Sequence, residues 1–219
     1  MAKKVVAMIP LKLTNQRLPG KNLLPLGNMR VCDHLFGTIL KIKIIDEIYV
    51  YCSDESIKDT IPSPLKFLKR DIYFDGDQVK TLEILESFIN EVDADIYVQI
   101  HVTTPFTRSE SIETALYKVI NEGYDSALTV FEQRTHCWFN GKPLNFNLDD
   151  VKRTQDILPV YTDTNGFCIF TKDVFKKLHR RTGNHPYFHI VDWIESADIN
   201  TPEDYAFAQA IQKYLEEQV

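Results

Sequence analysis

The sequence lacks every short motif that would by itself identify a nucleotide or metal site. Its four cysteines are scattered with no CxxC spacing, so we expect buried, reduced thiols rather than a zinc or redox centre. The glycine-rich patterns GxxxxGK[ST] and GxGxxG are both absent. No apolar run approaches the roughly 18 residues that span a bilayer, and no signal segment precedes the first apolar run. We therefore expect a cytoplasmic protein with no membrane partner.

Positive charge is also scarce. The chain has 25 Lys and Arg against 31 Asp and Glu, which gives a formal net charge of −6. Nucleic-acid-binding domains normally carry a broad basic face, so the composition argues against a nucleic-acid partner. Hydrophobic residues make up 44% of 219 residues, enough for one sizeable core. We expect a single domain over residues 1–219.

Short apolar runs alternate with amphipathic segments along most of the chain. This alternation is typical of helices that flank a largely parallel sheet, so it predicts the α/β class. We expect strands at 4–10, 47–54, 64–70, 95–102, 125–131, 165–170 and near 187–191. We expect helices at 31–42, 78–92, 109–123, from about 172, and from 201. Between about 132 and 164 the alternation stops and Asn140-Gly141 suggests a hairpin, so this segment is a candidate insertion.

The loop after the first strand is unusually basic. Ligands of open α/β sheets bind beyond the carboxyl ends of the strands, so this position favours a functional role. The stretch MIPLKLTNQRLPGKN, residues 8–22, contains Lys12, Arg17 and Lys21 and no acidic residue. These cations suit a phosphate group, bound through side chains more than through a glycine nest. A solvated basic loop without a ligand is an equally open interpretation of these residues alone.

Two further loops carry polar residues at expected strand ends. In IHVTTPFTR, residues 100–108, His101, Thr103 and Thr104 could face a ligand, although hydroxyl residues and proline are also common turn formers. A single histidine is also more often a core or rim residue than a ligand-binding one. In SADINTPED, residues 196–204, we expect Asp198 and Asn200 to lie on a strand, two apart and on one face, where both oxygens could reach one magnesium ion.

The residues after Asn200 predict a helix start. Thr201 fits the N-cap, Pro202 the first helical position and Asp204 the third, as in a capping box. Glu203 and Asp204 are therefore interpreted as helix-start residues rather than as ligands.

Taken in order along the chain, these motifs resemble the acylneuraminate cytidylyltransferase family, the synthetases of CMP-sialic acid and CMP-nonulosonic acids, with ketodeoxyoctonate cytidylyltransferases as close relatives. Residues 9–22, IPLKLTNQRLPGKN, align without a gap with the family pattern IPARxGSKGxPxKN. Residues 153–170, RTQDILPVYTDTNGFCIF, resemble RxQDxPxxYxxNGxxYI. Residues 195–205, ESADINTPEDY, resemble ESxDIDTPEDF.

The resemblance implies a Rossmann-like nucleotide-diphospho-sugar transferase fold, with a mostly parallel mixed sheet flanked by helices. It implies a homodimer formed through an insertion at 132–164, which would also contribute to the sugar site. The implied reaction transfers CMP from CTP to a 2-keto sugar acid, releases pyrophosphate and uses magnesium (Mg2+).

The resemblance also implies roles at matching positions. Nucleotide-binding roles fall on Lys12, Asn15, Arg17, Lys21, Asn22, Arg70 and Asp77. Sugar-binding roles fall on His101, which replaces a family glutamine, and on Thr103, Thr104, Arg153 and Gln155. Catalytic roles fall on Lys12, Lys21 and Asp198, and the metal ligands would be Asp198 and Asn200.

Asn200 departs from the family pattern, because the second carboxylate of DID is here an amide. An amide oxygen can coordinate a hard cation but adds no negative charge and cannot accept a proton as a base. Weaker metal binding, a shell completed by substrate phosphate and water, and loss of catalysis all stay open. So do nucleotidyl transfer to a different acceptor and a non-catalytic nucleotide-binding relative.

Overall fold

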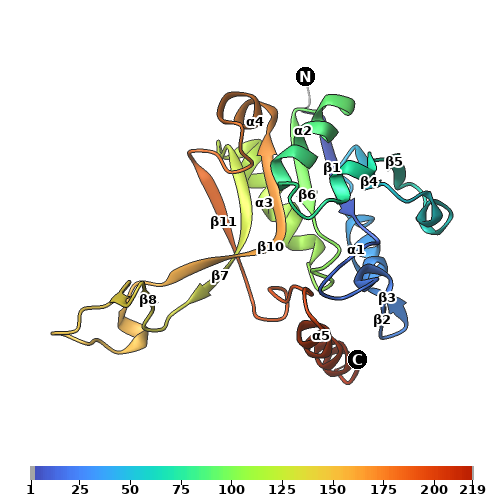
Figure 1. The fold of residues 1–219 in the computed structure, drawn as a ribbon. Helices are drawn as coiled ribbons and strands as arrows, with labels where there is room; N and C mark the ends of the chain where they lie inside the picture. The colour runs from blue at the N-terminus through green and yellow to red at the C-terminus, as the bar shows by residue number, and fades with distance from the viewer. Residues whose placement is uncertain (1–2, 219) are drawn as a thin grey trace.

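A seven-stranded mixed sheet organises the chain, in the order β11-β7-β10-β6-β1-β4-β5 (Figure 1). The computed structural model describes residues 3–218. The strands are β1 (Val5–Leu11), β4 (Glu47–Cys52), β5 (Lys66–Lys69), β6 (Ile96–Ile100), β7 (Ser126–Gln133), β10 (Val160–Thr171) and β11 (Pro186–Val191). Neighbouring strands are parallel except where β10 runs antiparallel to β6 and β7. The predicted α/β fold with a mostly parallel mixed sheet is confirmed.

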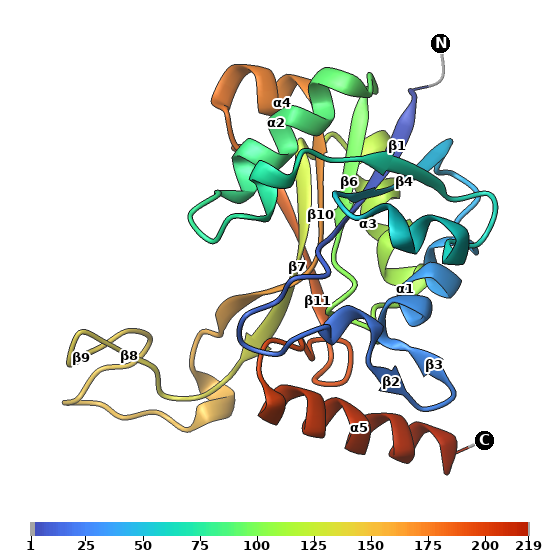
Figure 2. The same cartoon turned by 45° about the vertical axis from the view of Figure 1, so that its right-hand side comes forward.

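Helices cover both faces of this sheet (Figure 2). They are α1 (Val31–Ile39), α2 (Thr81–Glu91), α3 (Ser109–Asn121), α4 (Lys172–Leu178) and α5 (Pro202–Glu216). Successive strand residues point to opposite faces, so the apolar strand β1 contributes to two cores. Val5, Ala7 and Ile9 pack with α1 and α3. Val6 and Met8 pack with α2 and α4.

Helix α5 lies across the carboxyl end of the sheet and joins a third, smaller core (Figures 1 and 2). Its residues Ala208 and Ile211 pack with Ile199 and with Leu26, which belongs to a small ribbon made of β2 (Pro25–Leu26) and β3 (Met29–Arg30). The predicted capping box at the start of α5 is confirmed, since Thr201 accepts a hydrogen bond from the Asp204 N–H at 3.3 Å.

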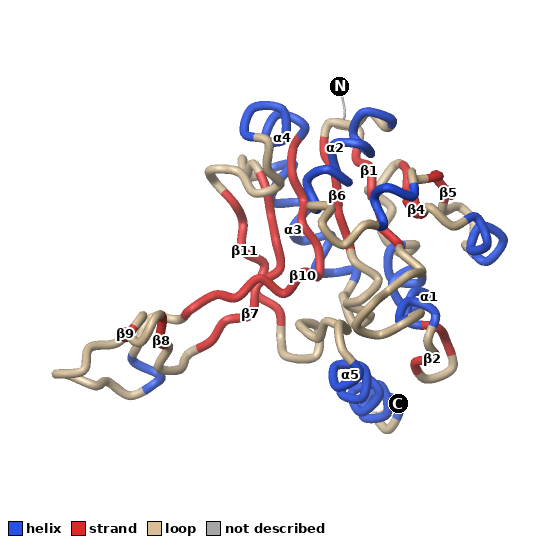
Figure 3. The backbone as a smooth tube through the Cα atoms, in the orientation of Figure 1, coloured by secondary structure: helices blue, strands red, loops and turns tan. Residues whose placement is uncertain are grey.

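Strands β7 and β10 continue beyond the sheet into an arm, residues 134–159, that projects away from the rest of the chain (Figure 3). The arm contains β8 (Trp138–Phe139), β9 (Lys142–Pro143) and a 3-10 turn, η4 (Thr154–Asp156). Asn140 and Gly141 join β8 to β9 with φ of 49° and 73°, the left-handed pair that a two-residue hairpin turn requires. Regular pairing of β7 with β10 extends into the segment 132–164, so the projecting part is shorter than expected.

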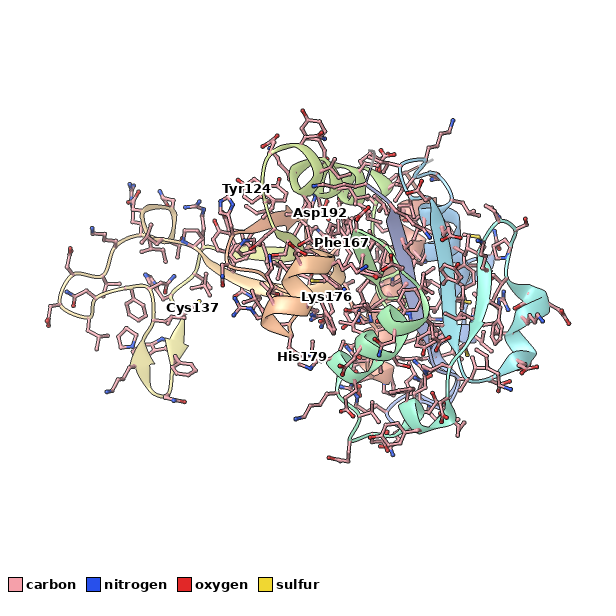
Figure 4. All side chains as sticks on the ribbon, turned by 90° about the horizontal axis from the view of Figure 1, so that it is seen from above. Tyr124, Cys137, Phe167, Lys176, His179 and Asp192 are labelled. Carbon is pink, nitrogen blue, oxygen red and sulfur yellow. The ribbon has the colours of Figure 1, made fainter. Side chains whose placement is uncertain are left out.

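The cysteines are all free thiols, as expected. Burial raises the pKa of Cys32 and of Cys168 to about 12, so both thiols stay protonated and inert near neutral pH. Cys137 differs from the expectation, because it lies in the arm and is only partly buried (Figure 4). Among residues 3–218, no helix is long and apolar enough to cross a bilayer.

Candidate active site

The site lies at the switch point of the sheet. From β1 the chain builds outward to β4 and β5, and then returns to the other side of β1 as β6. Parallel strands whose connections leave in opposite directions open a crevice at their carboxyl ends, which is where ligands of such sheets bind. The loops after β1 and β6 meet there.

The basic loop, residues 12–20, connects β1 to the 3-10 turn η1 (Lys21–Leu23). Asn22 is buried and its Nδ2 donates to the Lys12 carbonyl oxygen at 2.7 Å, which ties the two ends of the loop together. Gly20 has a φ of 65°, a left-handed conformation that glycine adopts at no steric cost. The loop therefore turns back and presents Lys21 toward the carboxyl-terminal part of the chain.

Lys21 joins the basic loop to the segment that precedes α5. Its Nζ donates to the Ile199 carbonyl oxygen at 2.6 Å and to Asn200 Oδ1 at 3.1 Å. Arg17 donates to the same Asn200 oxygen at 3.0 Å. Burial lowers the pKa of Lys21, and the charge of Asp198 opposes that effect. Two cations from one end of the chain therefore meet the Ile199-Asn200 segment from the other end.

These cations line a cavity of about 330 Å³, which we call the first cavity. It is lined by Lys12, Asn15, Gln16, Arg17, Leu18, Lys21, Asp77 and Asn200. Among the described residues, Asp77 is the one carboxylate that lines this cavity, and it lies 3.3 Å from the Lys12 ammonium. Three cations facing one carboxylate leave a surplus of positive charge, which suits a polyanion such as a chain of phosphates.

Arg70 fixes the neighbouring wall rather than reaching into solvent. Its side chain is 2% exposed, pairs with the Asp75 carboxylate and donates to the Leu11 carbonyl oxygen at 3.2 Å. Asp75 also accepts from the Ser53 hydroxyl at 2.6 Å. The loop that carries Asp75 and Asp77 is thereby held against the end of β1.

A second cavity, of about 180 Å³, adjoins the first, because Lys12 lines both. Its lining residues are Pro10, Lys12, Arg70, Phe74, Thr81, Ile84, Gln99 and His101. Gln99 on β6 and His101 just after it are two residues apart, and Gln99 is 1% exposed. His101 Nε2 is buried with no hydrogen-bond partner among the described residues. Burial, followed by the nearby charge of Arg181, lowers the pKa of His101 to about 4.

This low pKa predicts a specific pH dependence of stability. An unfolded histidine has a pKa near 6.5, whereas His101 in the fold stays neutral down to about pH 4. Its contribution to the free energy of unfolding is therefore complete above about pH 6.5 and is lost as the pH falls toward 4. Between about pH 6.5 and pH 4, the free energy of unfolding should therefore decrease by about 3 kcal/mol less in His101→Gln than in the wild type. Urea unfolding measured at pH 7 and pH 4.5 checks this, with exposed His185→Gln as the control. Parallel pH profiles for the wild type and His101→Gln would contradict it.

The two threonines after β6 occupy structural positions. Thr104 is fully buried and its hydroxyl donates to the His101 carbonyl oxygen at 2.8 Å, so it closes the turn after β6. The Thr103 carbonyl oxygen accepts from the Ile199 N–H at 2.8 Å, which joins this turn to the segment before α5. Neither residue lines the first or the second cavity.

The expectation that Asp198 and Asn200 lie on a strand is wrong, because this segment is an irregular loop. Their oxygens do not converge. Asn200 Nδ2 donates to Asp198 Oδ2 at 2.7 Å, while Asn200 Oδ1 accepts from Lys21 and Arg17. The amide is therefore turned so that its oxygen faces the basic loop.

One oxygen remains suited to a cation. Asp198 Oδ1 is buried and has no hydrogen-bond partner among residues 3–218. No group of three or more His, Cys, Asp or Glu side chains with metal-ligand spacing occurs in the same range. Magnesium is usually held by one or two carboxylates together with substrate phosphates and water. Asp198 fits that role as a single protein ligand.

Arg153 and Gln155 lie in the arm, apart from both cavities. Arg153 is 73% exposed and pairs with Asp156 at 2.8 Å. A single chain therefore does not bring these two residues to the site. Conversely, the sequence interpretation did not include Gln99, although a lone polar residue in the apolar strand IYVQI was a usable signal. It also omitted Arg181, for which no local pattern exists.

The fold and the two joined cavities define an α/β protein with a cationic crevice at the carboxyl ends of its parallel strands. The chain matches the cytidylyltransferase family over residues 6–217 and belongs to it. It is 21% identical over 213 residues to N-acylneuraminate cytidylyltransferase of Streptococcus agalactiae serotype III, covering 92% of this chain and 52% of the relative. It is 26% identical over 113 residues to 3-deoxy-manno-octulosonate cytidylyltransferase of Escherichia coli, covering 52% of this chain and 45% of the relative. The chain thus spans about half the length of these curated relatives.

Solved structures agree on the fold. A CMP:2-keto-3-deoxy-manno-octonic acid synthetase complexed with CTP superposes with a TM-score of 0.68 at 16% identity, covering 99% of this chain and all of the other. A 4-diphosphocytidyl-2C-methyl-D-erythritol synthase from Anaerococcus prevotii gives 0.68 at 14% identity, covering 98% of this chain and 96% of the other. At these identities the likeness concerns the fold alone.

Proposed function

We propose that the protein is a CTP-dependent cytidylyltransferase that activates a 2-keto sugar acid, releasing pyrophosphate and forming a CMP-sugar. The observation that carries the proposal is the first cavity, which Lys12, Arg17 and Lys21 line together with Asn200 at the switch point of the sheet. The family membership supports CTP as the nucleotide. Relatives named for N-acylneuraminate and for 3-deoxy-manno-octulosonate support a 2-keto sugar acid as the acceptor.

In this reaction the anomeric hydroxyl of the acceptor attacks the α-phosphorus of CTP in line, the bond to pyrophosphate breaks, and the hydroxyl proton is released to water. Negative charge grows on the phosphoryl oxygens and on the leaving group. The cations of the first cavity are placed to stabilise that charge, with Lys21 held in position by the Ile199 carbonyl oxygen. Holding the acceptor in the adjoining second cavity would supply the alignment that in-line transfer needs.

A magnesium ion would be held by Asp198 through its unpartnered Oδ1 together with phosphate oxygens. When bound, such an ion neutralises phosphate charge and favours departure of pyrophosphate. Asn200 Oδ1 is already engaged by Lys21 and Arg17, so the amide contributes to the position of these cations.

The proposal is tested by incubating the protein with magnesium and each of the four nucleoside triphosphates, together with an N-acylneuraminate or 3-deoxy-manno-octulosonate. Pyrophosphate release with CTP and at least one of these acids is expected. Release only with another triphosphate, or only with a different kind of acceptor, would overturn the proposal.

A second candidate is a non-catalytic nucleotide-binding protein. It is favoured by the amide at Asn200, which faces Asp198 with a hydrogen-bond donor instead of a second carboxylate. This candidate predicts that calorimetry detects CTP binding but that no turnover occurs at any magnesium concentration. The cytidylyltransferase proposal requires both CTP binding and turnover.

We further propose that the arm mediates a homodimer in the cytoplasm. Its side chains include large exposed apolar groups, among them Phe139 at 64% and Leu158 at 80% exposure. Apolar side chains concentrated on a projecting element are typical of an interface between subunits. A partner's arm could bring residues such as Arg153 and Gln155 to the sugar site.

We expect the double variant Phe139→Ser, Leu158→Asp to weaken self-association at least about 100-fold, because burying each apolar side chain contributes about 1.5–3 kcal/mol. Sedimentation velocity over a concentration series measures this. Tyr117→Ser, which changes an exposed aromatic residue on α3, is the matched control and should leave the mass unchanged. A wild type that sediments as a monomer at all concentrations would refute the dimer.

A further inference from the structure

Arg181 lines neither the first nor the second cavity itself, but it contacts Gln99, which lines the second. It lies in the loop between α4 and β11. One of its terminal nitrogens donates to Gln99 Oε1 at 3.1 Å, and Gln99 is itself almost fully buried on β6. Its carbonyl oxygen accepts a hydrogen bond from the Cys168 thiol at 3.5 Å. The guanidinium is therefore held at a fixed place beside the second cavity.

The charge of Arg181 is only partly compensated. Its nearest carboxylate, Asp163 on β10, is 3.7 Å away, longer than the roughly 2.8 Å of a charge-assisted hydrogen bond. The side chain is 24% exposed, and a guanidinium has five N–H donors in a planar fork. Several donors are therefore available to an incoming anion.

The position of Asp163 is set by an irregularity in β10. The pairing of β10 with β7 shifts register between Asp163 and Cys168. Asn165 adopts a φ of 57°, and Gly166 packs so closely against Thr129 that a Cβ atom would lie 2.9 Å from its hydroxyl oxygen. Asp163 is the last regularly paired residue before this bend, and its carboxylate lies 3.7 Å from the Arg181 guanidinium.

The neighbouring groups describe what kind of anion would fit. His101, close enough for the charge of Arg181 to lower its pKa, has an unpartnered and buried Nε2, and Gln99 lines the same cavity. A cation flanked by a neutral imidazole and an amide matches a carboxylate that is attached to a hydroxyl-bearing carbon. Because Lys12 lines both cavities, a ligand in the second cavity would lie next to phosphates in the first.

We propose that Arg181, positioned by Gln99, binds the carboxylate of the sugar acid acceptor and makes the site specific for acids. This assignment rests on the proposed cytidylyl transfer. It adds to the acceptor site a residue from the same subunit that forms the two cavities. It differs from a site in which the carboxylate is bound by Arg153, whose exposed side chain lies on the arm.

The experiment compares an N-acylneuraminate with its C1 carboxamide as acceptors, under saturating CTP and magnesium. In Arg181→Gln we expect the KM for the acid to rise at least about 30-fold while the KM for CTP changes less than twofold. The preference for the acid over the carboxamide should fall to near one, and Arg181→Lys should retain part of it, because a point charge replaces a fork. Arg180→Gln, a neighbouring exposed arginine that pairs with Asn184, is the control and should behave as the wild type.

A binding measurement keeps the test independent of turnover. Calorimetric titration of the acid into protein saturated with CMP should show the same loss in Arg181→Gln. An unchanged preference for the acid in Arg181→Gln overturns the assignment, and its loss in Arg153→Gln instead would place the carboxylate on the arm. A wild type that binds CTP but neither binds nor transfers to any 2-keto acid would instead refute the proposed function itself, and the inference with it.

Discussion

Replacing Lys21 by methionine is expected to lower kcat/KM for cytidylyl transfer by about two to three orders of magnitude. Methionine preserves the length and apolar stem of the side chain but removes the charge. Lys21 is held in position at the site, because Ile199 O and Asn200 Oδ1 both accept from it. Since it is partly desolvated, its charge interacts with a phosphate more strongly than an exposed lysine would.

The loss should appear mainly in kcat, because the lysine stabilises charge that grows as pyrophosphate leaves. Arg17→Met is expected to have a smaller effect, since Arg17 is exposed. Exposed Lys58→Met serves as the surface control. Steady-state kinetics for both substrates, with CTP affinity and urea unfolding measured on each variant, separates catalysis from folding. A Lys21→Met enzyme within tenfold of the wild type would show that Lys21 does not act on the transition state.

Periodicity predicted most of the helices and strands, but the layout of the sheet depended on contacts that periodicity does not encode. Strand β1 is apolar on both faces because helices cover both, so its unbroken apolar run was readable. Strand β10 was predicted only from residue 165, although it begins at Val160. Tyr161, Thr162 and Asp163 are exposed and show no apolar alternation, and only their pairing with β7 makes them a strand.

The candidate site was predictable where it depended on loops at strand ends. Lys12, Arg17, Lys21 and Asn200 do line one cavity, as the position of the basic loop and the resemblance suggested. The direction of the Asn200 amide was not predictable, because two groups far away in the sequence, Lys21 and Arg17, donate to its oxygen. The nearby Asp198 accepts from its nitrogen.

Residues with a purely tertiary role gave no signal at all. Arg181 reaches the crevice only because the loop after α4 folds back over Gln99. Thr104 is a residue whose sequence position was misleading. A hydroxyl at a strand end suggested a ligand contact, but this hydroxyl donates to the His101 carbonyl oxygen within the turn. A motif therefore locates a site better than it assigns the direction of each side chain within it.

The orientation of Asn200 gives the second large expected effect. In Asn200→Asp the donor that faces Asp198 Oδ2 at 2.7 Å is replaced by a carboxylate oxygen. Two carboxylates would then share this loop, with Lys21 and Arg17 offsetting only part of the repulsion. Without divalent metal, we expect the free energy of unfolding to fall by about 1–3 kcal/mol, the usual cost of losing a buried partner.

Magnesium should reverse this loss, because paired carboxylates supply the hard oxygen ligands that the ion prefers. We expect Asn200→Asp to bind magnesium at least tenfold more tightly than the wild type. At 100 times the dissociation constant, the bound ion would add about 2.7 kcal/mol to the stability of the variant. Thermal unfolding in EDTA and across a magnesium titration measures both effects without requiring activity.

Asn200→Ala is the matched control, since it also removes the donor to Asp198 but provides no new oxygen. It should be destabilised in EDTA and gain no additional response to magnesium. Pyrophosphate release by the Asn200→Asp protein should then reach its maximum at lower magnesium than in the wild type. If magnesium stabilises Asn200→Asp no more than Asn200→Ala, then Asp198 does not hold the ion, and the cations of the basic loop alone neutralise the triphosphate.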